Sequence, residues 1–246
     1  MLKPVRKQSL SEAVFTQLRD QIVNGELPPG APLPAERVLC EALGVNRGSI
    51  REALRRLQQS RLVSVRHGGT SQVLDYRASA GLDLLADLVL PANGRIDPRI
   101  VRGIIEMRSA LAPDIARRAA ERRTAAHLSL LNATLVRMRE HPGDLPVLQD
   151  LAVTLWSDLV DASDNLAYRL AYKSLRATYD QCRDLFTHVL AEETSDLAGY
   201  TAIVTAVSNS NGDVAARRAR MLIERGERGI KQILDHLPAN LSEMRA

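Results

Sequence analysis

The 246-residue chain has few of the residues that build cross-linked or metal-bound frameworks. It contains 2 cysteines and 5 histidines, and aromatic residues make up 3% of the sequence. Cys40 and Cys182 are far apart and have no companion at ligand spacing, which argues against both a disulfide framework and a zinc site. The sequence therefore favours a protein of a reducing compartment.

Motifs that assemble common catalytic centres are also missing. The chain has no nucleophile elbow, phosphate-binding loop, dinucleotide fingerprint or HExxH pair. His127, His141 and His236 are typical of solvated helix ends or turns, whereas His188 lies beside an aromatic stripe as either a core group or a pocket donor. Because catalysis needs converging acid, base or nucleophile groups, we expect that the protein is not an enzyme.

Long apolar runs are absent as well. No segment approaches the roughly 20 apolar residues of a membrane-spanning helix, and the basic N-terminus is followed by a polar stretch instead of an apolar one. The sequence predicts a soluble, cytoplasmic protein without a membrane partner. Its 45% hydrophobic residues are still enough for a substantial core.

The excess of positive over negative charge lies entirely in the first part of the chain. Through Asp75 there are 11 Lys and Arg against 7 Asp and Glu, whereas the remainder holds 22 of each. An excess of this kind is expected where phosphates are the partner, so the first part is predicted to bind nucleic acid. The neutral remainder argues against a nonspecific chromosome-packing protein.

Two short amphipathic helices are predicted between Pro34 and Leu57. The first presents one apolar face and ends at Gly44; the face consists of Val38, Leu39, Ala42 and Leu43. Asn46 is suited to cap the second helix, whose inward residues are Ile50, Ala53, Leu54 and Leu57 and whose opposite face carries Arg47, Arg51 and Arg55. The pair fits a helix-turn-helix, although an amphipathic hairpin with a solvated charged face has the same pattern.

The residues that follow favour the helix-turn-helix. Residues 62–65 and 72–74 read as short strands around the turn Arg66-His67-Gly68-Gly69-Thr70, which is rich in glycine and tipped with polar groups. A winged helix-turn-helix would place this tip against DNA.

Residues 9–75 resemble the GntR-type regulators. The resemblance is carried by Gly25-Glu26-Leu27-Pro28-Pro29-Gly30, Leu33-Pro34-Ala35-Glu36-Arg37, Gly44-Val45-Asn46-Arg47 and Arg51-Glu52-Ala53-Leu54, with Gly68 in the wing. It implies DNA contacts by Arg37, Asn46, Arg47, Ser49 and Arg51, and minor-groove contacts by His67 and Gly68. Gly48 stands where relatives often carry a phosphate-binding hydroxyl residue, so we expect that contact to be missing.

From about Ala80 the chain reads as successive amphipathic helices. One apolar stripe consists of Val101, Ile104, Ile105, Leu111 and Ile115. A second stripe is predicted along one long helix and consists of Tyr172, Leu175, Tyr179, Cys182, Phe186 and Leu190. Arg108 lies on the first stripe, where an unpaired guanidinium would be very costly. It either pairs with a carboxylate such as Glu106 or Asp114, or awaits an anionic ligand.

Residues 80–235 resemble the all-helical ligand-binding domain, the FCD domain, of the FadR branch of these regulators. The resemblance is carried by Glu106-Met107-Arg108-Ser109-Ala110-Leu111-Ala112-Pro113 and by Asp161-Ala162-Ser163-Asp164-Asn165. Many members of that branch hold a divalent metal with one Asp and three His. The corresponding positions here are Ala152, Trp156, Tyr200 and Glu224, so we expect no metal and no cofactor.

The same resemblance implies a pocket suited to a bulky apolar or amphipathic ligand. Its expected lining is Arg108, Trp156, Tyr172, Tyr179, Tyr200 and Glu224. Metal-free relatives include regulators that sense long-chain acyl-CoA, and Ile223, Gly226 and Ile230 match their last helix in part. Fatty acyl-CoA is therefore the first expected effector, and a small organic acid sensed by a repressor is the alternative.

The sequence thus predicts a mainly α protein. A winged helix-turn-helix with a small β-hairpin occupies residues 1–75, a linker 76–80, and an all-helical effector-binding and dimerisation domain 81–237, before a tail at 238–246. The expected function is a sequence-specific, DNA-binding transcriptional regulator. We expect it to bind a pseudo-palindromic double-stranded operator as a homodimer.

Overall fold

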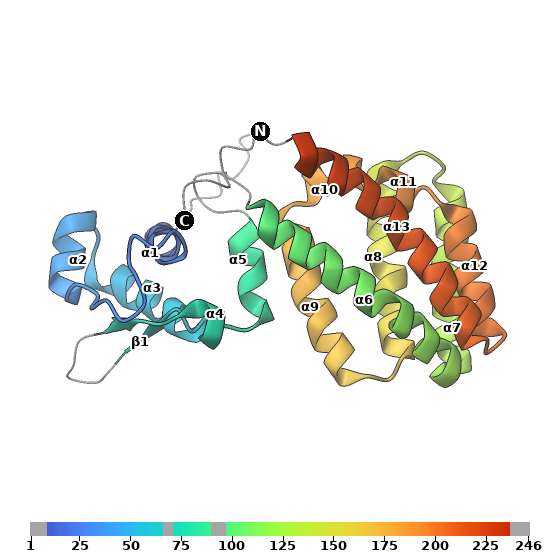
Figure 1. Cartoon of the computed structure of the whole chain (residues 1–246), viewed down its shortest axis with the longest axis horizontal. Helices are drawn as coiled ribbons and strands as arrows, with labels where there is room; N and C mark the ends of the chain where they lie inside the picture. The colour runs from blue at the N-terminus through green and yellow to red at the C-terminus, as the bar shows by residue number, and fades with distance from the viewer. Residues whose placement is uncertain (1–8, 66–70, 90–96, 237–246) are drawn as a thin grey trace, which may run out of the picture. The chain divides into compact units, whose positions relative to one another are not determined.

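The computed structural model describes residues 9–65, 71–89 and 97–236, and Figure 1 shows their helices and strands. The chain divides into two compact units, Met1–Ile96 and Asp97–Ala246. Each unit has its own hydrophobic core. Among the described residues, none of the helices combines the length and the apolar character that a bilayer-spanning helix requires.

The N-terminal unit is a small helical domain with one hairpin. Its described elements are α1 (Leu10–Val23), α2 (Glu36–Leu43), α3 (Arg47–Gln59), β1 (Val63–Ser64), β2 (Gln72–Val73), α4 (Tyr76–Ser79), η1 (Leu82–Leu84) and α5 (Leu85–Val89). Strands β1 and β2 pair antiparallel, with Val63 opposite Val73. On the other side of β2, the amide of Gly30 donates to the carbonyl of Val73 at 2.8 Å. The predicted helix-turn-helix and its hairpin are thereby confirmed.

Two details of this unit differ from the prediction. Val38 is 43% exposed and Ala42 is also exposed, so Leu39 is the one fully buried residue of the predicted apolar face. The reason is that α2 has only 8 residues and packs mainly on α3, which covers a narrow stripe. Residues 76–80, predicted as a linker, instead form α4, whose Tyr76 packs on the N-terminal core with Ala80 and Leu84.

A buried ion pair joins the first and last described helices of this unit. Arg19 is 4% exposed, and its guanidinium contacts Asp20 at 2.8 Å and Asp87 of α5 at 3.1 Å. Burial raises the pKa of Asp87, and the charge of Arg19 opposes that effect. The compact unit therefore extends well past residue 75, because α5 is part of it.

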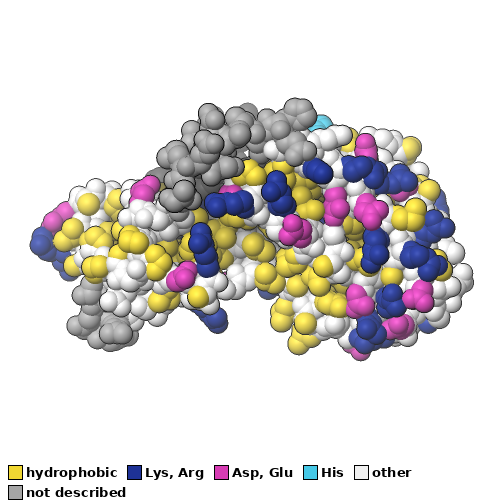
Figure 2. All heavy atoms as spheres, viewed as in Figure 1, with side chains coloured by type: hydrophobic (Ala, Val, Ile, Leu, Met, Phe, Trp, Pro, Cys, Tyr) yellow, Lys and Arg dark blue, Asp and Glu magenta, His cyan; other side chains and the backbone are white. Residues whose placement is uncertain are grey.

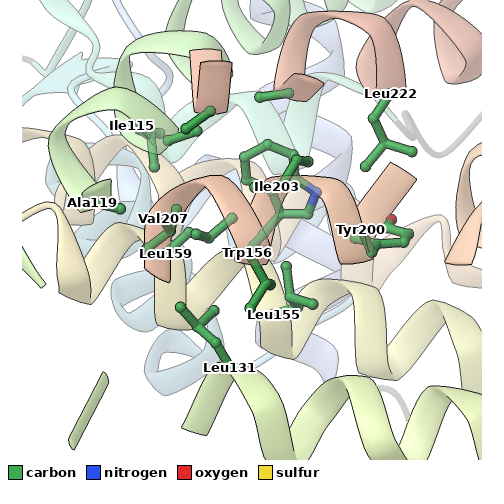
Figure 3. Packing of buried hydrophobic residues seen from close by; sticks show 14 of the residues in the cluster. Ile115, Ala119, Leu131, Leu155, Trp156, Leu159, Tyr200, Ile203, Val207 and Leu222 are labelled. Carbon is green, nitrogen blue, oxygen red and sulfur yellow. The ribbon is translucent and has the colours of Figure 1, made fainter. Parts of the chain in front are cut away.

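The C-terminal unit is a bundle of helices throughout its described residues. These are α6 (Pro98–Arg122), α7 (Ala125–Glu140), α8 (Leu145–Ala162), α9 (Leu166–Gln181), α10 (Arg183–Val189), α11 (Ala191–Thr194), α12 (Leu197–Ser208) and α13 (Gly212–His236). Helix α13 runs beside α6 (Figure 1), and α8 and α12 supply many of the buried core residues. Figure 3 shows the central packing, with Leu131, Leu155, Leu159 and Ile203 among the buried residues. The predicted all-helical class is confirmed.

The predicted single helix through residues 172–190 is wrong. The chain leaves helical geometry at Cys182 (φ −109, ψ 20) and again at Leu190 (φ −95, ψ 10), giving α9, α10 and α11 in place of one helix. The apolar repeat continues across both breaks because all three segments face the same bundle. These breaks set the direction of the short α11, which supplies Glu193 to the interior.

Surface charge on the C-terminal unit is balanced. Figure 2 shows basic and acidic side chains interspersed over the part of this unit formed by α6 and α13. This agrees with the sequence of this unit, in which residues 97–246 hold 20 Lys and Arg and 20 Asp and Glu. The net positive charge of the protein therefore lies in its N-terminal unit.

One hydrogen bond between α9 and α6 makes stability depend on pH. The hydroxyl of Tyr168 donates to Asp114 at 2.6 Å and, with Arg118, holds the pKa of Asp114 below its usual 3.8. A carboxyl with a lowered folded-state pKa stabilises the fold above its unfolded pKa, and that contribution is lost as the pH falls through the folded value.

Tyr168→Phe is therefore expected to reduce the free energy of unfolding by about 1 kcal/mol at neutral pH. The difference from the unaltered protein should shrink as the pH falls below 3.8. Urea unfolding of both proteins over a pH series measures this. A difference that stayed constant down to the acid limit would show that the bond to Asp114 is not its cause.

Candidate nucleic-acid interface and effector site

Helix α3 is held so that its arginines point away from the core. The side chain of Asn46 caps the helix by accepting from the amide of Ser49 at 2.9 Å. Ile50, Ala53, Leu54 and Leu57 are all 7% exposed or less, as predicted. Arg47, Arg51 and Arg55 are exposed. The geometry is that of a recognition helix with a buried inner face and a basic outer face.

Two of the expected DNA-contacting arginines are paired with carboxylates in this structure. Arg37 contacts Glu41 at 2.6 Å, and Arg51 of α3 contacts Glu36 of α2 at 2.9 Å. Both arginine side chains are about two-thirds exposed, at 69% and 66%. Exposed pairs contribute only about 0–1 kcal/mol, so a phosphate or base edge can replace either carboxylate. His67 and Gly68, the expected wing contacts, lie outside the described residues.

In the C-terminal unit, the partner of Arg108 is Glu193 of α11. This corrects the two partners considered from the sequence, because Glu106 is exposed and Asp114 is engaged by Tyr168 and Arg118. Glu193 is 2% exposed and binds the guanidinium through Oε1. Burial raises the pKa of Glu193, and the charge and hydrogen bond of Arg108 oppose that effect.

Four aromatic residues predicted to line a pocket lie near this pair. Tyr200 is fully buried, and Trp156 beside it is 7% exposed (Figure 3). The phenol groups of Tyr172 and Tyr179 are close enough to Arg108 to interact with its charge. The structure thus gathers Trp156, Tyr172, Tyr179 and Tyr200 around Arg108, from α8, α9 and α12.

Several buried polar atoms of this region have no hydrogen-bond partner among the described residues. They are Tyr179 OH, Glu193 Oε2 and Tyr200 OH, and Trp156 Nε1 lies against the hydroxyl of Tyr200. By contrast, Tyr172 donates to the carbonyl of Val153 at 2.7 Å. A buried polar group without a partner costs about 1–3 kcal/mol, so such a cluster is typical of a site completed by a bound molecule. We call Arg108, Trp156, Tyr179, Glu193 and Tyr200 the interior polar cluster.

Glu224 does not join the other predicted lining residues. It is exposed on α13, whereas Ile223 and Gly226 of the same helix are buried. Gly226 faces α11, and any side chain there would overlap Oε2 of Glu193. Across the described residues, no group of three or more His, Cys, Asp and Glu side chains is placed to hold a metal ion.

Glu193 is the member of the interior polar cluster that sequence reasoning missed. The sequence shows two consecutive glutamates, Glu192 and Glu193, and nothing local indicates which one faces inward. The structure places Glu193 inside and leaves Glu192 at the surface with 71% of its side chain exposed. Only the angle of α11 to the bundle makes that distinction.

The winged head and the helical bundle define a class of protein, the DNA-binding transcriptional regulators with a ligand-binding domain. The family model "Bacterial regulatory proteins, gntR family" matches residues 10–73, and the model "FCD domain" matches residues 103–225. The chain belongs to the GntR family and carries a C-terminal FCD domain, which confirms the family predicted from the sequence.

Relatives with established names agree with this assignment. The HTH-type transcriptional regulator Mce2R of Mycobacterium tuberculosis is 35% identical over 233 residues, covering 95% of this chain and 96% of that protein. The galactonate operon transcriptional repressor of Escherichia coli is 28% identical, covering 91% and 97%. The fatty acid metabolism regulator protein of Proteus mirabilis is 27% identical, covering 77% of each.

Among solved structures, the regulator Lar of Listeria monocytogenes aligns with a TM-score of 0.61 at 17% identity. The alignment covers 93% of this chain and 100% of that one. At this identity the likeness concerns the fold alone.

Proposed function

We propose that this regulator binds a specific operator and that a small anionic effector, held in the C-terminal unit, changes its affinity for that operator. The observation that carries the proposal is the interior polar cluster, in which Arg108, with 25% of its side chain exposed, pairs with the buried Glu193 beside polar atoms that have no partner among the described residues. Burying polar groups without partners destabilises a protein, so a core without a ligand-binding role is not expected to contain them.

On the DNA side, we propose that α3 enters the major groove. Its outward Arg47 and Arg51 would contact base edges or phosphates, with Asn46, Ser49 and Arg37 at the backbone. His67 and Gly68 of the wing would reach the minor groove. Because one head reads only a short half-site, the active form would be a homodimer on a pseudo-palindromic operator.

For the effector, we propose an amphipathic anion bound without a metal. Ala152, Trp156 and Tyr200 stand at positions where the resemblance to the FadR branch implies metal ligands, and they offer an apolar surface instead. Fatty acyl-CoA is the leading candidate, supported by the relatives named as fatty acid metabolism regulators. A small organic acid is the second candidate, since another relative is named as a galactonate operon repressor.

Titration with oleoyl-CoA in the presence of EDTA tests this proposal. Trp156 is the only tryptophan and lies in the cluster, so its fluorescence should change on binding. Operator affinity should change in the same titration by about 5- to 150-fold, the usual range of coupling between two sites. The physical reason is that the effector can shift the protein only as far as its affinities for the two states differ.

The control is a parallel titration with a small carboxylate, with and without added zinc. If oleoyl-CoA had no effect while zinc restored a response to the small carboxylate, both the metal-free site and the amphipathic ligand class would be wrong.

A further inference from the structure

The ion pair between Arg108 and Glu193 joins two elements of very different size. Arg108 belongs to α6, a helix of 25 residues that packs along α13. Glu193 belongs to α11, which has 4 residues and is bounded by Leu190 and Ser195. A cation on a long, well-packed helix has a fixed position, whereas a carboxylate on one helical turn can move at a lower energetic cost.

Glu193 is poorly satisfied where it lies. Oε1 accepts from Arg108, but Oε2 is buried without a partner among the described residues. The carboxylate of Glu227 on α13 adds a further charge that disfavours the ionised form of Glu193. Room for the carboxylate exists because position 226 is glycine. Glu193 is therefore an acceptor for Arg108 that a better acceptor can replace.

Two other unpartnered atoms near Arg108 are hydrogen-bond donors. The hydroxyls of Tyr179 and Tyr200 can each donate a hydrogen bond, and neither has an acceptor among the described residues. Trp156 Nε1 lies against the Tyr200 hydroxyl. Gln149 is not among these donors, because turning its amide lets Nε2 donate to Thr187 Oγ1, whose own proton goes to the carbonyl of Arg183. A cation beside hydroxyl groups that lack acceptors is suited to bind a group with several negatively charged oxygens.

We propose that Glu193 is an internal substitute for the anionic group of the effector, and that the effector binds by displacing Glu193 from Arg108. The incoming carboxylate or phosphate oxygens accept hydrogen bonds from Arg108 and from the hydroxyls of Tyr179 and Tyr200. The apolar tail lies against Trp156 and Tyr172. Displacement moves α11, which is the change that binding transmits to the rest of the bundle. This inference rests on the effector site proposed above and adds what the site must release.

Glu193→Gln tests the displacement step. The variant removes the competing charge and leaves Arg108 available, so oleate or oleoyl-CoA should bind about tenfold more tightly than to the unaltered protein, as one charge-assisted hydrogen bond would give. Trp156 fluorescence in EDTA measures the affinities on the full-length chain. The two ligands separate the sources of the anion: oleate presents a carboxylate, and oleoyl-CoA presents phosphates with a thioester.

Glu192→Gln is the matched control. Glu192 is the preceding residue, is 71% exposed and lies 3.8 Å from Arg228 at the surface. The Glu192→Gln substitution removes the same charge from the same helix. Because Glu192 lies at the surface and does not pair with Arg108, the affinities for oleate and oleoyl-CoA should be unchanged. If Glu192→Gln tightened binding as much as Glu193→Gln, the effect would be one of general charge and the proposal would be overturned.

Gly226→Ala provides a second route that does not depend on Glu193→Gln folding well. The added methyl group would overlap Oε2 of Glu193 and push the carboxylate off Arg108 without changing any charge. It should therefore tighten anion binding in the same direction. Thermal denaturation with and without oleate provides a second readout, with a larger ligand-induced rise in Tm for both variants than for the unaltered protein.

The results separate this inference from the proposed function. If the unaltered protein responds to a ligand but both variants bind it with equal or lower affinity, Glu193 is not a competitor and the inference fails alone. If neither the unaltered protein nor the variants bind oleate or oleoyl-CoA, the effector site itself is wrong and both fail together.

Discussion

Replacing Arg51 with alanine is expected to weaken operator binding by about 1–3 kcal/mol, and Arg47→Ala by a similar amount, as for the loss of a base-edge contact. Both side chains lie on the exposed face of α3, opposite the buried Ile50 and Leu57. Folding should be unaffected, because the pair that Arg51 makes with Glu36 is a surface pair.

Fluorescence anisotropy on operator DNA measures these affinities, and repeating the titration at several salt concentrations identifies the contact. Loss of a phosphate contact lowers the salt dependence and weakens binding to every sequence, whereas loss of a base contact relaxes specificity. Arg217→Ala is the control, since Arg217 is an exposed arginine of α13 in the C-terminal unit. Unchanged affinity of the Arg47 and Arg51 variants, with normal melting curves, would contradict the assignment of α3 as the recognition helix.

Arg108→Met is expected to have the largest effect on stability. The change leaves Glu193, which is 2% exposed, buried without its cation, and breaking a buried pair in this way costs about 3–5 kcal/mol. The free energy of unfolding, measured with urea, should fall by that amount. The effect comes from the carboxylate left behind and not from the loss of the methylene chain, because methionine keeps most of the apolar volume.

The double variant Arg108→Met with Glu193→Leu distinguishes these causes. Replacing both members of a buried pair by apolar residues is often neutral or stabilising, so the double variant should recover most of the lost stability. Arg102→Met serves as the control, because Arg102 is an exposed residue of the same helix, and its midpoint should not move. A double variant as unstable as Arg108→Met would show that packing, and not charge, is responsible.

Local patterns were sufficient for the DNA-reading unit. The spacing of Ile50, Ala53, Leu54 and Leu57 identified the buried face of α3, and Asn46 was identified as its cap. The hairpin was found from its two apolar strands and the turn between them. These features depend on interactions between residues that are close in sequence, where helical and strand periodicity determine which side chain faces the core.

The same reasoning was less accurate where an element had few neighbours or where the chain turned sharply. Val38 is on the predicted apolar face of α2 and yet is exposed, because no other element of the described part of the chain covers that side of a short helix. The repeat of apolar residues through Cys182 predicted one helix, since periodicity records which residues face the bundle and not whether the backbone is continuous. Residues 76–80 read as a linker because a four-residue helix has too short a pattern to detect.

By itself, the sequence determined the two-part organisation, the basic outer face of α3, the all-helical C-terminal unit and the presence of an inward arginine at position 108. Each of these follows from composition or from a periodic pattern within one element. Only the tertiary structure decided that Glu193, 85 residues away in the sequence, is the partner of Arg108, that Glu192 is not, and that Glu224 faces solvent. An ion pair between distant helices depends on the angles at which they pack, and no local pattern contains that information.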